Sequence, residues 1–167
     1  MLEEDIINTI TLFLDDNHYS NAALEYTRLA EYYKINGTNT NVIDAYVNAF
    51  KYYEQDHNII LALPCLLEAA YLLVNQRNYK LAISYLEYIR NYHQHNKNEY
   101  LWKNINVELA ILHWKMNDLV VEESDYFIHD LEFINLLHNK CYNEQFYTLK
   151  NKYHLHPSII ALLPIHL

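Results

Sequence analysis

Histidine and cysteine side chains near the C-terminus are the residues of this chain most able to do chemistry. His138 and Cys141 are three residues apart, and His154 and His156 follow. Four such ligands can bind zinc if the last helical hairpin folds back on itself. Their spacing matches no standard zinc signature, so we predict no metal site. A metal-dependent or catalytic role for these residues stays an alternative that elemental analysis would test.

Carboxylates also come in groups, as a general acid and base would need. The groups fall where helices are expected to begin or end, and there acids favour the helix N-terminus or solvent. The single glycine excludes a glycine-rich phosphate loop. No Ser, His and acid form a nucleophile motif. We therefore predict no enzyme, no catalytic residue and no cofactor. The groups are Glu3-Glu4-Asp5, Asp15-Asp16, and Glu122-Glu123 with Asp125.

The elements that would position any site are helices. The chain has 167 residues, of which 51 % are hydrophobic, with one Gly and three Pro. An all-β fold needs many turn residues that tolerate positive φ, and one Gly cannot supply them. Segments of helical length carry apolar residues at steps of three and four, as in 79–92 and 99–116. The composition and periodicity predict an all-α protein.

The expected helix starts repeat along the chain. Alternate starts are 37 to 42 residues apart, which is the spacing of a helical-hairpin solenoid of the tetratricopeptide type. We predict about eight antiparallel helices in one domain, 1–167, with a hairpin array over 1–137 and C-terminal capping helices over 138–167. Pro64 favours a start nearer residue 62 for the fourth helix. The expected starts lie near residues 2, 20, 41, 59, 78, 99, 118 and 141.

Charge and hydropathy limit the partners and the compartment. The net charge is −9 with His neutral, the opposite of a nucleic-acid binder. No apolar run approaches the ~18 residues of a membrane span, and the N-terminus lacks the basic region of a signal peptide. The two Cys, Cys65 and Cys141, are too few for a disulfide framework. We expect a cytoplasmic protein, in the host cytosol if its source is a pathogen.

Three stretches of the chain resemble the soluble NSF attachment protein (SNAP) family. They are LAEYYK (29–34), VIDAYVNAFKYYEQ (42–55) and CLLEAAYLLVNQRNYKLAISYLEYI (65–89). The shared order is a helix ending in aromatics, a helix ending in a Tyr-Tyr pair, a Cys-Leu-Leu start and a Tyr-x-x-Ala-Ile helix. The likeness extends over nearly the whole chain and is firmest over 19–115.

This resemblance implies a twisted sheet of helical hairpins capped by a helical bundle. It also implies an adaptor without catalytic activity, which binds the SNARE four-helix bundle along a charged concave face and recruits the ATPase NSF. The chain departs from the family in three ways. It starts several helices in, and it ends before the last helix and acidic tail that engage NSF. Two lysines that the family uses on SNAREs align with Leu24 and Pro64.

We therefore predict a SNAP-like adaptor of vesicle fusion that competes with a true SNAP for a SNARE complex or NSF. The alternative is a helical-repeat scaffold that binds an unrelated peptide or protein. Membrane association would be peripheral and through partners. An apolar end face also favours a homodimer. The candidate partner-binding residues are Arg28, Tyr33, Lys51, Tyr53, Arg90 and Lys103.

Overall fold

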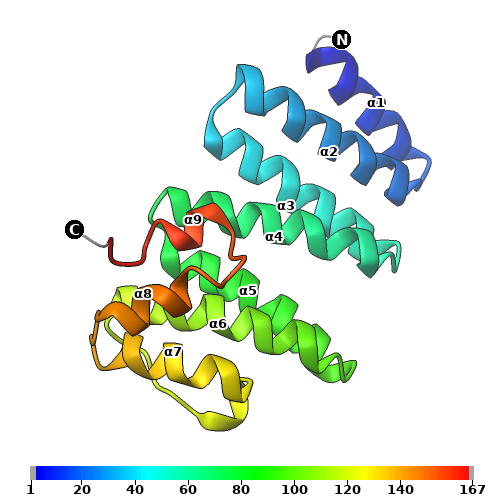
Figure 1. Ribbon diagram of the computed structural model, residues 1–167. Helices are drawn as coiled ribbons and strands as arrows, with labels where there is room; N and C mark the ends of the chain where they lie inside the picture. Colours follow the sequence, from blue (N-terminus) through cyan, green and yellow to red (C-terminus); the bar gives the residue numbers. More distant parts are fainter. Residues whose placement is uncertain (1–2, 166–167) are drawn as a thin grey trace. The chain divides into compact units, whose positions relative to one another are not determined.

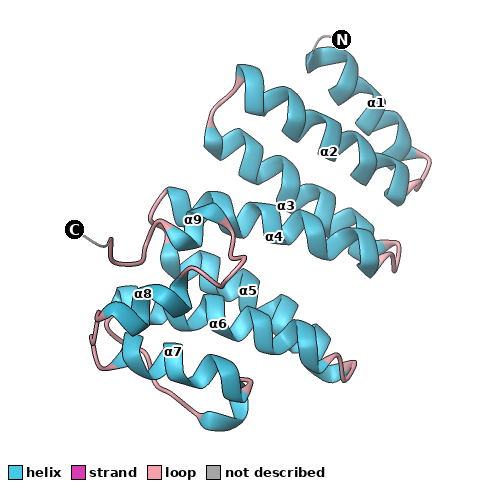
Figure 2. Ribbon diagram, in the orientation of Figure 1, coloured by secondary structure: helices cyan, strands magenta, loops and turns pink. Residues whose placement is uncertain are grey.

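The structure, a computed structural model, describes residues 3–165 and divides into two compact units (Figure 1). All regular structure within 3–165 is helical (Figure 2). Unit 1 is Met1–Gln76 and unit 2 is Arg77–Leu167. The helices of unit 1 are α1 (Glu3–Asp15), α2 (Tyr19–Asn36), α3 (Asn39–Gln55) and α4 (Ile59–Asn75). Those of unit 2 are α5 (Tyr79–His95), α6 (Glu99–Met116), α7 (Ile128–His138), α8 (Glu144–Lys150) and α9 (Pro157–Ile160).

A repeated turn sets the length of the hairpins. Helices α2 to α6 begin at residues 19, 39, 59, 79 and 99, so one hairpin takes 40 residues and the predicted helical-hairpin solenoid is confirmed. In most of these turns one residue has positive φ, and an amide reaches back to close the preceding helix, as Asn58 N does to Tyr53 O at 2.8 Å. Asn, His, Arg and Lys fill the left-handed position, which explains how the array forms with one Gly. These residues are Asn17, His57, Arg77, Lys97 and Asn117.

Small side chains hold the helices of unit 1 close together. Each helix packs on the next in chain order, α1 on α2, α2 on α3 and α3 on α4 (Figure 1). The contact surfaces are rich in alanine that is fully or almost fully buried, and alanine lets two helix backbones approach closely. Larger apolar residues such as Val42 and Leu66 fill the remaining space. The buried alanines are Ala22, Ala23, Ala30, Ala45, Ala49, Ala62, Ala69 and Ala70.

Aromatic residues form the core of the last part of unit 2. Helices α5 and α6 make one more hairpin, after which α7 packs on α6, and α8 packs on α7. Phe133 of α7 stacks on Phe146 of α8 with 5.3 Å between ring centroids, and both side chains are fully buried. The ring centroid of Tyr153 lies 4.8 Å from that of Phe133. The capping helix predicted after Pro157 is α9, which packs on α6.

Two sequence-based boundaries are wrong. Helix α4 begins at Ile59 and carries Pro64 inside it, not near its start. Pro64 is exposed, so water can reach the Ile60 carbonyl that loses its usual amide partner. The helix predicted from 118 begins at Ile128 instead. The intervening segment is held outside a helix by Asn106, whose Nδ2 donates to the Asp125 carbonyl at 2.9 Å.

The described residues therefore contain nine α-helices where about eight were expected. The division of 1–167 into an array ending at 137 and capping helices over 138–167 stays a prediction. Among residues 3–165, none of the helices combines the length and apolar character of a membrane span.

Candidate partner-binding site

The exposed sides of α2 and α4 form one surface of unit 1, which we call the α2–α4 face. It consists of Leu24, Arg28, Glu31 and Lys34 on α2 with Pro64 and Glu68 on α4. Residues three and four apart on a helix share a side, so each stripe is continuous along its helix. Lys34 Nζ lies 4.0 Å from Glu68 Oε2, which places the two stripes on the same side of the unit.

A lysine near the end of α2 is the best-connected cation on this face, and sequence reasoning missed it. Lys34 Nζ lies 2.7 Å from Glu31 Oε1, and the Tyr46 hydroxyl donates to the same carboxylate oxygen at 2.6 Å. The amine also lies 5.1 Å from the Tyr46 ring centroid. Burial acts to lower the pKa of Lys34, but the hydrogen bonds outweigh it and raise that pKa. The spacing Glu31-x-x-Lys34 could have indicated the ion pair. The contact with Tyr46 could not be predicted, because Tyr46 is on another helix and distant in the sequence.

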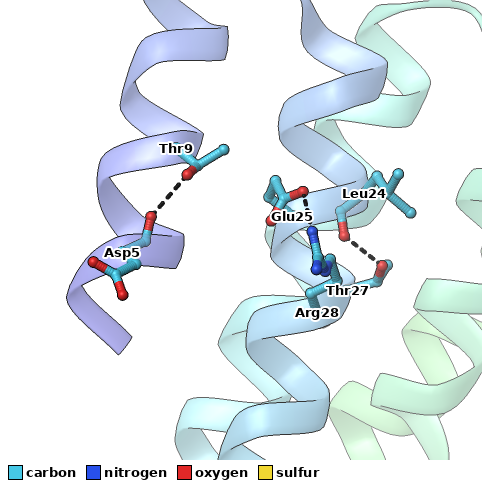
Figure 3. A network of polar contacts seen from close by, with 6 residues as sticks. All are labelled: Asp5, Thr9, Leu24, Glu25, Thr27 and Arg28. Carbon is cyan, nitrogen blue, oxygen red and sulfur yellow. Dashed lines mark hydrogen bonds and ion pairs between the residues drawn. The ribbon is translucent and has the colours of Figure 1, made fainter. Parts of the chain in front are cut away.

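Arg28 is on the surface, but it is already paired. Its Nη1 donates to Glu25 Oε1 at 2.8 Å, and its side chain is 50 % exposed (Figure 3). Glu25 is buried, so the arginine neutralises a carboxylate that lies among packed helices. A partner carboxylate at Arg28 would have to compete with Glu25, which lowers the positive charge that this residue presents.

The two predicted tyrosines occupy positions that restrict their contacts. Tyr53 is 5 % exposed and belongs to the core of unit 1, which makes it unsuitable as a surface contact. Its neighbour Tyr52 is the less buried member of that pair and is half-buried, because adjacent helical residues point about 100° apart. Tyr33 is half-buried, and its hydroxyl donates to Glu3 Oε1 of α1 at 2.5 Å. The hydrogen bond to Glu3, together with burial, raises the pKa of Tyr33 to about 12.

Lys51 differs from the other cations of unit 1. It is exposed on α3, and among residues 3–165 it has no ion-pair partner. Its amine lies 5.5 Å from the centroid of the Tyr52 ring. That ring stacks on Tyr26 of α2 at 5.5 Å. Lys51 thus sits beside a tyrosine stack that joins α2 to α3, and it offers a cation together with an aromatic surface.

The two candidates of unit 2 lie in different surroundings. Lys103 of α6 has a side chain only 13 % exposed, and its amine pairs with Glu99 Oε1 at 2.8 Å and lies over the rings of Trp102 and Phe127. Arg90 of α5 is half-buried and donates to Asn91 Oδ1 at 3.0 Å and 3.2 Å. Arg90 also lines a pocket within unit 2. Their role in partner binding stays a prediction.

Leu24 and Pro64 occupy equivalent places in successive hairpins. They are 40 residues apart, the length of one hairpin, and both lie on the α2–α4 face. Leu24 is 53 % exposed and Pro64 is exposed. The positions that the resemblance assigns to SNARE-binding lysines are therefore on the surface and apolar in this chain.

The C-terminal histidines and cysteine do not form a metal-binding cluster within the described residues. Within residues 3–165, no group of three or more His, Cys, Asp or Glu side chains is placed to hold a metal ion. His156 Nδ1 accepts the Ser158 amide at the start of α9. Cys65 is buried, and burial raises the pKa of its thiol to about 11, so it packs as a small apolar residue.

Comparison with known proteins identifies the family. No curated protein and no solved structure matches the chain. The sequence model described as "Soluble NSF attachment protein, SNAP" matches residues 4–129. That range holds α1 to α6 and the segment that leads into α7, so the match covers the hairpin array with its α2–α4 face. The chain belongs to the soluble NSF attachment protein family.

Proposed function

We propose that this chain is a non-enzymatic adaptor that binds a protein of the SNARE and NSF machinery through the α2–α4 face. The match of residues 4–129 to the soluble NSF attachment protein family carries the proposal. Stacked hairpins support it, because they offer a long, rigid surface to an elongated partner. Family membership also favours an adaptor over an enzyme.

The charge of unit 1 defines how such a partner would bind. Unit 1 has three Lys and Arg (Arg28, Lys34 and Lys51) against eleven Asp and Glu, a net charge of −8. Arg28 and Lys34 already pair with carboxylates of their own helix. Little positive charge is left to steer an acidic partner. We therefore propose that binding at the α2–α4 face depends on a rearranged Arg28 and on apolar contact at Leu24 and Pro64, and that Lys51 of α3 adds a contact outside this face.

We also propose that the chain competes with other family members for the same partner without stimulating disassembly. The apolar residues at the two lysine positions support this, since they weaken the electrostatic part of SNARE binding and keep the helical scaffold. The second candidate is a scaffold for an unrelated partner. The exposed Leu24 and Pro64 favour it, because they suit an apolar partner surface.

A pull-down against an assembled SNARE complex, alone and with NSF, tests the proposal. We expect binding without faster disassembly, and loss of binding in Arg28→Glu with Lys51→Glu. Lys97→Glu is the matched control, because Lys97 is exposed on the turn after α5. Unchanged affinity in the double variant would remove the surface around Arg28 and Lys51 from consideration. Capture of neither SNAREs nor NSF would leave the unrelated scaffold.

Restoring the two lysines sharpens the test. Leu24→Lys with Pro64→Lys should strengthen SNARE binding, and the gain should shrink as salt rises, because exposed charges are screened. A double variant that binds no better at low salt would contradict the assignment of the α2–α4 face.

A further inference from the structure

A pocket in unit 2 has features that the proposed function does not use. Its volume is about 250 Å³, and α5, α6 and the segment that follows α6 supply its walls. Its lining includes the charged and polar residues Arg90, Asp118, Glu122, Asp125 and Tyr126 and the apolar residues Leu109 and Val120. All of these residues belong to unit 2, so the pocket is complete within one compact unit.

A tyrosine hydroxyl in this pocket is open to a ligand. The Tyr126 residue is only 6 % exposed, and within residues 3–165 its hydroxyl makes no hydrogen bond to the protein. No buried side-chain nitrogen or oxygen of these residues lacks a partner, so the hydroxyl reaches solvent. Burial raises the pKa of Tyr126 to about 12; Asp125 and Glu122 act in the same direction and Arg90 in the opposite one. The hydroxyl therefore lies among the charged groups of the pocket. A ligand in the pocket can therefore hydrogen-bond to this hydroxyl in place of water.

The carboxylates of the pocket outnumber its cations. Glu122 and Asp125 have neither an ion pair nor a side-chain hydrogen bond within 3–165, whereas Asp118 Oδ1 lies 3.0 Å from His113 Nδ1. Arg90 is the only Lys or Arg side chain of the lining, and its guanidinium bonds to Asn91. The excess of carboxylates favours a cationic ligand over an anion.

The backbone that carries these groups is fixed to α6. Asn106 is buried, and its Nδ2 donates to the Asp125 carbonyl at 2.9 Å. This bond holds the 3₁₀ turn Glu123–Asp125 beside α6. The carboxylates next to it are therefore positioned before any ligand arrives, which lowers the entropy cost of binding.

We propose that this pocket binds the ammonium or guanidinium group of an alkyl cation, either a Lys or Arg side chain of a protein partner or a free polyamine. The charged head would donate to Glu122, Asp125 and the Tyr126 hydroxyl. The methylene stem would lie along Leu109 and Val120, as long basic side chains cover apolar surface elsewhere. The site is separate from the α2–α4 face.

An NMR titration of the full chain with blocked arginine amide, blocked citrulline amide and spermidine tests this proposal. Citrulline has the shape of arginine without its charge. We expect saturable shifts of amides in 106–126 with arginine or spermidine at about 10 mM, and none with citrulline. Tighter binding of a blocked Ala-Arg-Ala peptide than of spermidine would identify a protein side chain as the source, and the reverse order would identify a polyamine.

Three variants decide whether the pocket is responsible. Glu122→Gln with Asp125→Asn should weaken cation binding by about fivefold or more, and Tyr126→Phe should weaken it less. Glu123→Gln is the matched control, because Glu123 is adjacent in the same turn but does not line the pocket. An equal loss in the control, saturation by inorganic phosphate at the same amides, or absence of saturation by either cation would overturn the proposal.

Discussion

The two units differ in what holds them together. Unit 1 is an array of helices 13 to 18 residues long, joined by short turns and packed through alanines. Unit 2 begins with one hairpin of the same kind and then continues with shorter helices around Phe133, Phe146 and Tyr153. Alanine surfaces repeat and allow an array to be extended, whereas a cluster of aromatic rings closes on itself. The repeated hairpins of unit 1 are therefore packed through alanine, whereas the last helices of unit 2 are packed through aromatic rings.

The largest effect that separates the units should come from Phe133→Ala. The ring is fully buried and contacts Phe146 and Tyr153, so its loss leaves a cavity and should cost about 3–5 kcal/mol of unfolding free energy. Hydrogen exchange should show lost protection in α6 to α9 and retained protection in α2 and α3. Phe133→Leu serves as the milder control. Equal loss of protection in both units would mean that they do not unfold separately.

A smaller loss should follow from Tyr153→Phe. The Tyr153 hydroxyl donates to Asp130 Oδ1 at 2.7 Å, and Asp130 is 2 % exposed at the start of α7. Removing the donor leaves that carboxylate with the His129 imidazole, whose Nε2 lies 3.4 Å away from Oδ1. We expect a loss of about 1.5–3 kcal/mol, as for a hydrogen bond to a charged group. Urea unfolding measures it, with Tyr79→Phe as the control; a loss no greater than that of the control would contradict this role.

In unit 1, stability should be sensitive to a larger side chain at a buried alanine. Ala69 of α4 is fully buried, and Ala69→Leu would overpack the core around α4, at a cost of about 1–3 kcal/mol. Exchange should increase in α3 and α4, while α7 and α8 keep their protection. Ala161→Leu, at an exposed position after α9, should have little effect. A stable Ala69→Leu protein would show that alanine is not what sets the spacing of these helices.

Regular features of the array could be predicted from the sequence, because they are local. The apolar period and the turn residues indicated the hairpins, and the observed 40-residue hairpin falls within the expected steps of 37 to 42. The candidate site was harder to predict, because the sequence does not show which of two adjacent residues is buried. Tyr52 and Tyr53 are adjacent, and only the packing of α3 decides that Tyr53 is buried.

The part that could not be predicted depends on contacts between distant residues. Leu119, Val120 and Val121 look like the start of a helix, but Asn106 bonds to the Asp125 carbonyl nineteen residues away and holds this segment outside α7. The same bond builds the pocket beside Tyr126. The Lys34, Glu31 and Tyr46 contacts likewise join α2 to α3, and the sequence could have indicated only the ion pair within α2.

The contacts among Lys34, Glu31 and Tyr46 should make the unfolding free energy of unit 1 depend on pH in the alkaline range. Burial and the hydrogen bond to Glu31 raise the pKa of Tyr46 from 10.0 to about 12. A group with a raised pKa stabilises the fold fully below its unfolded pKa, and that stability is lost as the pH rises toward the folded value. Lys34, whose pKa is also raised, acts in the same direction. Unfolding free energy should therefore fall between about pH 10 and 12, and Tyr46→Phe should flatten this slope. Tyr100→Phe, at an exposed tyrosine, should leave it unchanged.

The smallest expected effect on stability is that of Arg28→Ala. Its ion pair with Glu25 spans three residues of one helix, and the arginine side chain is half exposed. Such pairs contribute about 0.5 kcal/mol or less. Thermal unfolding should therefore change little, and any loss of SNARE binding in this variant would come from the surface and not from unfolding. A large drop in stability would instead assign Arg28 to compensation of the buried Glu25, and would make Leu24 and Pro64 the better residues for testing the α2–α4 face.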